Sequence, residues 1–353
     1  MDENEEKDCE FVSSRGILKS CDIYSNNPKS SCNSDYKYLL EIIQKNKNQQ
    51  QHHHQHKNGT SIYICSELLS FFISQILPKL QFQFILVTGD SDLIIPNEAI
   101  SYKQYIYLIN NPLLIKWFAQ NKLISANHPR ISPLPIGLDY HTIYQNPNHK
   151  WVYQNLAKEI NLNKDSHYPI NQEKELKDII FFSQHIHFQE RKCKIFCNIQ
   201  FNLDRWGDRQ SALNQIPQAL LEFISSSTPI PRNKTWREMT KYQFVLSPYG
   251  NGFDCHRTWE SLILGCIPIV CNSKIQDLYT DLPVLQVTNW REITLSLLEK
   301  TAKEFNEKMT NHQYSLEKLT LKYWQNQIKG YSSEPVHLGT GVGDRGALIS
   351  SRG

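Results

Sequence analysis

Short apolar runs alternate with amphipathic stretches along the first half of the chain. The runs with the length of buried strands are Ile62–Cys65, Phe84–Thr88, Tyr105–Ile109 and Leu134–Ile136. The stretches with helical spacing of apolar positions are Glu67–Leu80 and Leu113–Asn121. Because strands that alternate with helices are typical of a parallel sheet, we expect a first α/β lobe over residues 60–145.

A second alternating region follows a polar, Asn- and Lys-rich stretch at 146–174. Its strand-like runs are Asp178–Ser183, Gln243–Ser247, Ile267–Val270 and Val284–Val287. The pattern predicts a second α/β lobe over 175–300, with the polar stretch as a linker and a helical segment at 301–330. The chain is therefore expected to fold as two Rossmann-like lobes that face a cleft.

The two ends of the chain are polar. Residues 1–59 contain the tract Gln49–His56, and residues 331–353 include a Gly- and Ser-rich stretch. Such segments bury little apolar surface, so we expect both to be tails, and trimming 1–58 and 340–353 to leave a stable core. The adjacent histidines are typical of a low-complexity expansion and have no fixed geometry for a metal ion.

Composition narrows the class of protein. With 38 Lys and Arg against 35 Asp and Glu, the net charge of +3 forces no basic surface, which argues against a nucleic-acid binder. The acidic N-terminus is not a signal peptide, and no stretch approaches the roughly 18–20 apolar residues that span a bilayer. We expect a cytoplasmic protein with no integral membrane segment, whose 9 cysteines are reduced.

The segment from 242 to 290 carries the most chemistry. It is expected to form a strand at Phe244–Leu246, a Gly-containing turn, a helix capped by Asp254 that Gly265 ends, and a further strand at Ile267–Val270. Such a turn places a helix N-terminus at the carboxyl edge of a parallel sheet. There the helix dipole and free N–H groups favour a phosphate.

Three polar residues share one face of that helix, Arg257, Glu260 and Ser261. Arg257 is placed to neutralise a diphosphate, and Glu260, one turn deeper, to accept hydrogen bonds from ribose hydroxyls. The alternative is an ordinary Arg–Glu pair on a solvated helix face. The expected backbone donors around the turn belong to Gly250, Asn251, Gly252 and Asp254.

The same segment resembles the exostosin-like glycosyltransferases. The matching residues are Ser247-Pro248, Gly250, Gly252, Arg257, Glu260, Gly265–Val270, Leu282-Pro283 and Trp290, preceded by Trp236–Met239. A looser upstream similarity lies at Val87–Asp92 and Pro135–His141. The resemblance implies a GT-B-like fold with an acceptor lobe at 60–145, short for the family, and a donor lobe at 175–300.

The resemblance also implies a reaction. A hexosyl or pentosyl unit would pass from a nucleotide-sugar, UDP- or GDP-linked, to a saccharide or another hydroxyl acceptor. Arg191 falls where the family often places another basic residue that binds the diphosphate. With Arg257, Arg191 and the helix dipole as charge sink, no metal or other cofactor is required.

An inverting transfer needs a base for the acceptor hydroxyl. The candidates are Asp90, Asp92 and Asp139, each of which would serve equally well as a turn residue or a helix cap. Two other readings stay open. Asp90-Ser91-Asp92 also fits the Asp-x-Asp pattern that holds Mn²⁺ or Mg²⁺ in metal-dependent glycosyltransferases. Alternatively, the chain is a non-catalytic module that binds a nucleotide or a sugar.

Overall fold

The computed structural model describes residues 3–25, 38–40, 59–147, 149, 167–199, 204–223, 230–271 and 274–330. The His-rich tract, most of the predicted linker and the predicted C-terminal tail lie outside these residues.

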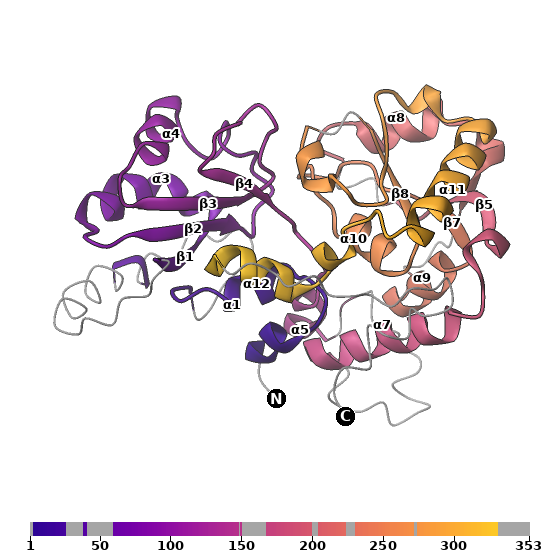
Figure 1. Cartoon of the computed structure of the whole chain (residues 1–353), viewed down its shortest axis with the longest axis horizontal. Coiled ribbons are helices and arrows are strands. Elements are labelled where there is room, and N and C mark those ends of the chain that lie inside the picture. Colours follow the sequence, from indigo (N-terminus) through magenta and orange to yellow (C-terminus); the bar gives the residue numbers. More distant parts are fainter. Residues whose placement is uncertain are drawn as a thin grey trace.

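The first sheet is parallel, with strand order β1-β2-β3-β4 (Figure 1). Its strands are β1 (Thr60–Cys65), β2 (Phe84–Gly89), β3 (Leu114–Gln120) and β4 (Ile131–Leu134). Its α-helices are α3 (Leu69–Phe71), α4 (Tyr102–Ile109) and α5 (His141–Gln145). Every residue of β1 and β2 is buried, as expected for parallel strands that are covered on both faces.

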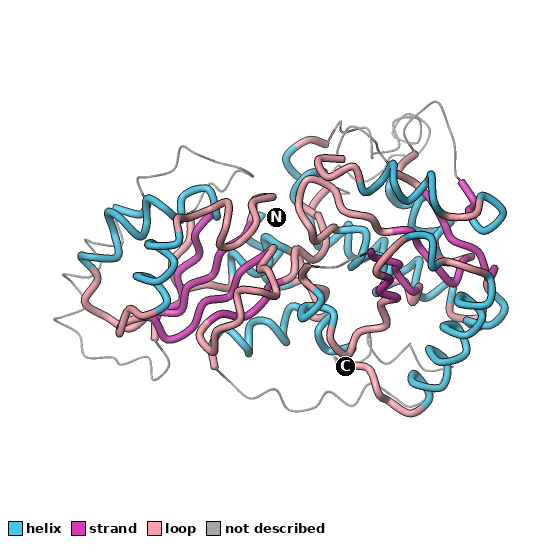
Figure 2. Tube along the Cα trace, turned by 90° about the horizontal axis from the view of Figure 1, so that it is seen from above, coloured by secondary structure: helices cyan, strands magenta, loops and turns pink. Residues whose placement is uncertain are grey.

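The second sheet is also parallel and has the order β6-β5-β7-β8-β9. Its strands are β5 (Lys192–Cys197), β6 (Leu221–Phe223), β7 (Tyr242–Leu246), β8 (Ile267–Cys271) and β9 (Leu285–Val287). Its helices are α7 (Pro169–Ser183), α8 (Asp208–Gln215), α9 (Arg232–Met239), α10 (His256–Ile263) and α11 (Leu295–Thr310). Figure 2 shows the two sheets as separate bodies, which confirms the prediction of two Rossmann-like α/β lobes.

Three of the predicted elements have the wrong type. The run Tyr105–Ile109 belongs to α4, which begins at a capping box of Ser101 and Gln104. The stretch Leu113–Asn121, expected to be helical, contains β3. The run Asp178–Ser183 is the end of α7, and the strand that opens the second sheet is β5. Short apolar runs do not distinguish a buried strand from a buried helix face.

The prediction of an N-terminal tail is wrong for residues 3–25. Helix α1 (Ser14–Lys19) packs with α12 (Leu321–Lys329), and the flanking residues Phe11 and Val12 are buried (Figure 1). Backbone hydrogen bonds join Val12 N–H to Leu319 O (2.9 Å) and Leu321 N–H to Glu10 O (2.8 Å). The first and last described segments therefore form one unit, and trimming residues 1–58 would remove part of the core.

The predicted linker is also shorter than expected at its C-terminal end. Residues 169–174 form the first turns of α7, and Pro169 occupies the first helical turn, where a missing N–H is tolerated. The predicted helical segment at 301–330 contains the end of α11, a 3₁₀ turn at Leu316–Leu319 and α12.

Candidate functional site

The two lobes meet at the carboxyl edges of their sheets. Asn121 directly follows β3, and its Oδ1 accepts hydrogen bonds from the N–H groups of Phe253 (3.1 Å) and Asp254 (3.0 Å), in the loop after β7. The Ile136 N–H, in the loop after β4, donates to Asp254 Oδ2 at 2.7 Å. The loops that leave the strands of one sheet therefore contact those of the other.

A cavity of about 210 Å³ lies at this junction. Its lining comes mainly from the first lobe and consists of Ser14, Asp90, Ser91, Asp92, Gln120, Ile136, Asp139, His141, Thr142 and His256. The structure thus brings the three predicted bases into one cavity, beside the first residue of α10. Their placement follows from the parallel sheet, because the loops after neighbouring strands end at one edge.

The carboxylate of Asp90 is paired with Arg15, a residue of α1 that was not among the predicted site residues. Arg15 Nη2 lies 3.2 Å from Asp90 Oδ2, and the two side chains are 0% and 5% exposed. A buried guanidinium keeps such a carboxylate ionised and reduces its tendency to take up a proton. Asp92, in contrast, is exposed.

The carboxylate of Asp139 lies 3.1 Å from Nδ1 of His141. Burial raises the pKa of Asp139, but His141, His256, Arg232 and the Thr142 N–H outweigh burial and hold that pKa below its ordinary value. Burial also lowers the pKa of His141 to about 4, so its ring is neutral at pH 7. Neither group has the pKa near 7 that suits a base.

The remaining ring in the cavity belongs to His256, which sequence reasoning did not select. Its Nδ1 lies 2.7 Å from the carbonyl oxygen of Gly137, in the loop after β4. Because a carbonyl oxygen only accepts, Nδ1 carries the hydrogen, and Nε2 of the neutral ring holds the lone pair.

Asp254 does not cap α10 as predicted. The N-cap residue is Cys255, whose side chain makes no capping hydrogen bond. The buried Asp254 carboxylate instead accepts hydrogen bonds from Trp259 Nε1 (3.0 Å) and Tyr279 OH (3.1 Å), in addition to that from Ile136. Burial raises its pKa to about 6 against these hydrogen bonds. Asp254 therefore joins the two lobes, and its carboxylate is occupied by donors of the protein itself.

Two of the four backbone donors predicted around the turn, those of Gly250 and Asp254, are occupied. The Gly250 N–H donates to Gly252 O (3.2 Å), and those of Phe253 and Asp254 donate to Asn121. The Asn251 carbonyl accepts from Trp206 Nε1 at 2.9 Å. The turn is thus held by the protein itself, which weakens the expectation that it wraps a phosphate.

Arg257 lies at a topological switch point. The chain leaves β5 through α8 toward β6, and leaves β7 through α10 toward β8, on the other side. Ligands of open α/β sheets bind in the crevice at such a point. Arg257 Nη2 donates to the carbonyl oxygen of Asn198 (2.6 Å), the first residue after β5. Arg257 is half-buried.

A second arginine, Arg209 of α8, lies near this crevice and was not predicted. Its Nε donates to Tyr249 O at 3.0 Å, and the side chain is buried. Burial lowers the pKa of Arg209, and the positive charge of Arg257 lowers it further. Arg209 lies in the first turn of α8, which begins directly after the left-handed Gly207, and no local pattern in the sequence marks it as a ligand.

The other predicted donor ligands differ in their placement. Glu260 is half-buried, and its carboxylate has no partner among the described residues. The Ser261 hydroxyl donates to the carbonyl of Arg257 at 2.6 Å and is buried, so it is not available to a ligand. Arg191 Nη1 donates to Leu264 O and Gly265 O, each at 3.1 Å. Arg191 therefore contacts the C-terminal end of α10, away from the N-terminal end at which we expected a phosphate.

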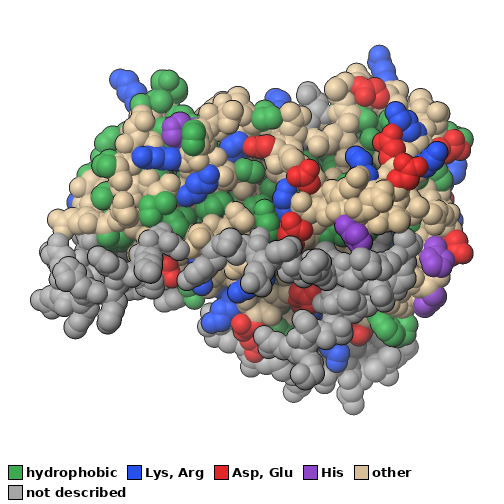
Figure 3. Space-filling view, in the orientation of Figure 1, with side chains coloured by type: hydrophobic (Ala, Val, Ile, Leu, Met, Phe, Trp, Pro, Cys, Tyr) green, Lys and Arg blue, Asp and Glu red, His purple; other side chains and the backbone are tan. Residues whose placement is uncertain are grey.

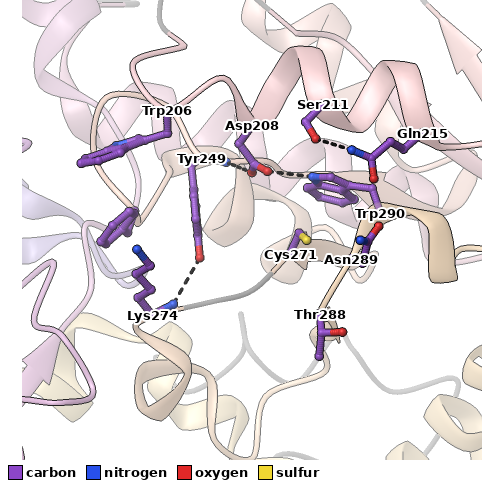
Figure 4. Close-up of a pocket in the computed structure, with 11 residues that line it drawn as sticks. Trp206, Asp208, Ser211, Gln215, Tyr249, Cys271, Lys274, Thr288, Asn289 and Trp290 are labelled. Atoms are coloured by element: carbon purple, nitrogen blue, oxygen red, sulfur yellow. Dashed lines mark hydrogen bonds between the residues drawn. The ribbon is translucent and has the colours of Figure 1, made fainter.

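A larger pocket of about 310 Å³ lies in the second lobe, next to the turn after β7 (Figure 4). Its lining consists of Trp206, Asp208, Ser211, Gln215, Tyr249, Phe253, Cys271, Lys274, Thr288, Asn289 and Trp290. Asp208 holds two of these residues in place, because its carboxylate accepts hydrogen bonds from Tyr249 N–H (2.9 Å) and Trp290 Nε1 (2.7 Å). Aromatic side chains with a few polar groups are typical of the lining of a small-molecule site.

Surface charge, clusters of potential metal ligands and membrane-spanning helices do not identify a further site in the described residues. Basic and acidic side chains are intermingled on the face that Figure 3 shows. Within the described ranges, no group of three or more His, Cys, Asp or Glu residues is arranged to hold a metal ion, and the described cysteines are free. The same part of the chain contains no helix with the length and apolar character needed to cross a bilayer.

Comparisons with known proteins are sparse. No protein-family model matches the sequence, and no curated protein matches it. Among solved structures, the chain is similar to Anabaena HepE, determined in complex with UDP. The identity is 10%, the match covers 83% of this chain and 77% of that chain, and the TM-score is 0.35. At that TM-score the likeness carries no functional argument, and the exostosin-like resemblance stays a prediction.

Proposed function

We propose that this protein is an exostosin-like glycosyltransferase that moves a sugar from a nucleotide-sugar donor to the hydroxyl group of an acceptor. The observation that carries the proposal is the position of α10. Its first residue, His256, lines the interlobe cavity with the candidate bases, and its second, Arg257, reaches the crevice between β5 and β7. An acceptor site and a leaving-group site thus meet at one helix end.

The donor half of the site is the crevice at β5 and β7. Arg257 and Arg209 provide two neighbouring cations for the departing nucleoside diphosphate, with the positive end of α10 beside them. Glu260, one turn further along α10, accepts hydrogen bonds from the ribose hydroxyls. Two cations at this position would neutralise the departing diphosphate without a metal ion.

The acceptor half is the 210 Å³ cavity. We assign one acceptor sugar ring to it. Asp90 is paired with Arg15 and the pKa of Asp139 is lowered, so we assign both to hydrogen bonds with acceptor hydroxyls; the exposed Asp92 is the carboxylate that remains as a candidate base.

A panel of nucleotide-sugars tests this proposal directly. We expect one UDP- or GDP-linked donor to raise the melting temperature, and to release nucleoside diphosphate when a hydroxyl acceptor is added. The Asp-x-Asp alternative would require EDTA to abolish nucleotide binding and Mn²⁺ to restore it.

The non-catalytic alternative draws on one observation, the occupied backbone donors of the turn at 250–254. A binding module would be stabilised by the nucleoside diphosphate without ever consuming the donor. Turnover therefore separates the two functions.

A further inference from the structure

His256 holds its ring in one tautomer through a contact between the lobes. It belongs to α10 of the second lobe, whereas its hydrogen-bond acceptor, the Gly137 carbonyl, follows β4 of the first. With Nδ1–H donating to this oxygen at 2.7 Å, the lone pair of the neutral ring lies on Nε2. A fixed tautomer whose other nitrogen is basic is what a general base requires.

We propose that His256 is the catalytic base that removes the proton from the acceptor hydroxyl, an inference that rests on the proposed function. The hydroxyl proton passes to Nε2 while the acceptor oxygen forms a bond to the anomeric carbon of the donor sugar. The bond from that carbon to the phosphate oxygen breaks, and its electron pair stays on the nucleoside diphosphate. The imidazolium then returns its proton to solvent.

The other groups of the cavity are less suited to this step. Asp90 is paired with the buried Arg15, and Asp139 has a pKa below its ordinary value. Burial holds the pKa of His141 near 4, which leaves that ring a poor proton acceptor. Asp92 is the remaining competitor, since it is exposed and lines the same cavity.

Charged groups of both signs face His256. The carboxylates are those of Asp139 and Asp254, which lie in the loops after β4 and β7. The positive groups that face the same region are Arg232 and, when protonated, His141.

Arg257, the residue after His256, is placed to neutralise the leaving group. Consecutive residues of a helix point about 100° apart, so His256 and Arg257 face different sides of α10. One ring lines the acceptor cavity, and the guanidinium of the next residue reaches Asn198 at the crevice. Proton removal and neutralisation of the leaving group are thereby placed on either side of the reacting carbon.

The kinetic test uses His256→Asn in the full chain. The Asn amide can still donate to the Gly137 carbonyl, because its nitrogen replaces Nδ1, but nothing basic replaces Nε2. We expect kcat to fall about 10²- to 10⁴-fold, with partial rescue by added imidazole and an unchanged Kd for UDP or GDP. His312→Asn is the matched control, since His312 is exposed and its φ of 52° is tolerated by Asn.

Two kinetic results would overturn the assignment. One is a His256→Asn enzyme with the kcat of the wild type. The other is loss of kcat in Asp92→Asn alone, which would make Asp92 the base. Absence of transfer by the wild type across the donor panel would instead refute the proposed function.

A readout that needs no activity is long-range ¹H–¹⁵N NMR of protein labelled at histidine, with His256→Asn used to assign the signal. We expect the pattern of a ring protonated at Nδ1 and unprotonated at Nε2 above the pH at which it titrates. The opposite tautomer would leave no lone pair on Nε2 and would overturn the inference even in an active enzyme.

Discussion

Replacing Arg257 by Ala should weaken the binding of a nucleoside diphosphate and leave the binding of the bare nucleoside nearly unchanged. The side chain is half-buried, and the partner that the structure gives it is the Asn198 carbonyl, so its removal strands no buried charge. A hydrogen bond to a charged group contributes about 1.5–3 kcal/mol, which corresponds to roughly 10- to 150-fold in Kd.

Glu260→Ala provides the contrast. A carboxylate that binds the ribose should contribute equally to nucleoside and diphosphate, so both are expected to lose affinity by about the same 10- to 150-fold. Glu260→Gln should do less damage, because its carbonyl oxygen still accepts. Since the Glu260 carboxylate has no partner among the described residues, neither change should disturb the fold.

Calorimetry on both variants, with uridine, UMP and UDP and then the guanosine series, distinguishes these patterns. Arg237→Ala is the matched control, because Arg237 is exposed on α9, and circular dichroism verifies folding. The site assignment fails if either variant binds the diphosphate as tightly as the wild type. It also fails if Arg257→Ala weakens the nucleoside as much as the diphosphate.

Four further outcomes are expected. Arg15→Ala should lower the free energy of unfolding, measured by urea denaturation, by about 3–5 kcal/mol, because it leaves a buried charge on Asp90. The double variant Arg15→Ala/Asp90→Ala should recover part of that loss, and no recovery would contradict a buried ion pair. Burial raises the pKa of Glu6 from 4.5 to about 7, so the folded state keeps a proton that the unfolded state loses, and the free energy of unfolding should fall as pH rises between those values. Glu6→Gln should flatten that slope in urea denaturation, and an unchanged slope would contradict a buried, uncharged carboxyl. Asn121→Gly keeps the backbone φ of 54° but removes the contact with the turn, and should reduce transfer more than nucleotide affinity; equal losses would contradict this. EDTA should leave UDP or GDP affinity unchanged in calorimetry, and a loss that Mn²⁺ reverses would favour the Asp-x-Asp alternative.

The sequence predicted the architecture better than the individual elements. Two separate alternations of apolar runs were enough to predict two parallel sheets. Runs of this length are buried between layers, and the spacing between them leaves room for the helices that connect parallel strands. The type of each element depends on partners elsewhere in the chain. Leu114–Gln120 becomes a strand because β2 and β4 pair with it, which no local pattern reveals.

The same reasoning accounts for what was missed in the site. Asp90, Asp92 and Asp139 were found because residues that follow parallel strands share an edge. Arg15 lies in a polar segment whose burial depends on α12, more than 300 positions away in the sequence. Similarly, the role of His256 depends on a carbonyl group in the other lobe.

Arg191 and Ser261 illustrate the limit of motif transfer. Arg191 was selected from the family resemblance and Ser261 from its helix face, yet the side chain of Ser261 is turned back onto its own helix, and that of Arg191 binds the far end of the same helix. A motif specifies residue types and spacing, but hydrogen bonding within the fold decides which side chains remain available to a ligand.

The most direct test of the account is a turnover assay with the full-length protein and a panel of nucleotide-sugars in the presence of hydroxyl acceptors. We predict that one donor is consumed, with release of the nucleoside diphosphate and formation of a glycosylated acceptor, and that Arg257→Ala lowers kcat/KM for that donor. Tight binding of a nucleoside diphosphate with no consumption of any donor would contradict the account and identify the chain as a binding module.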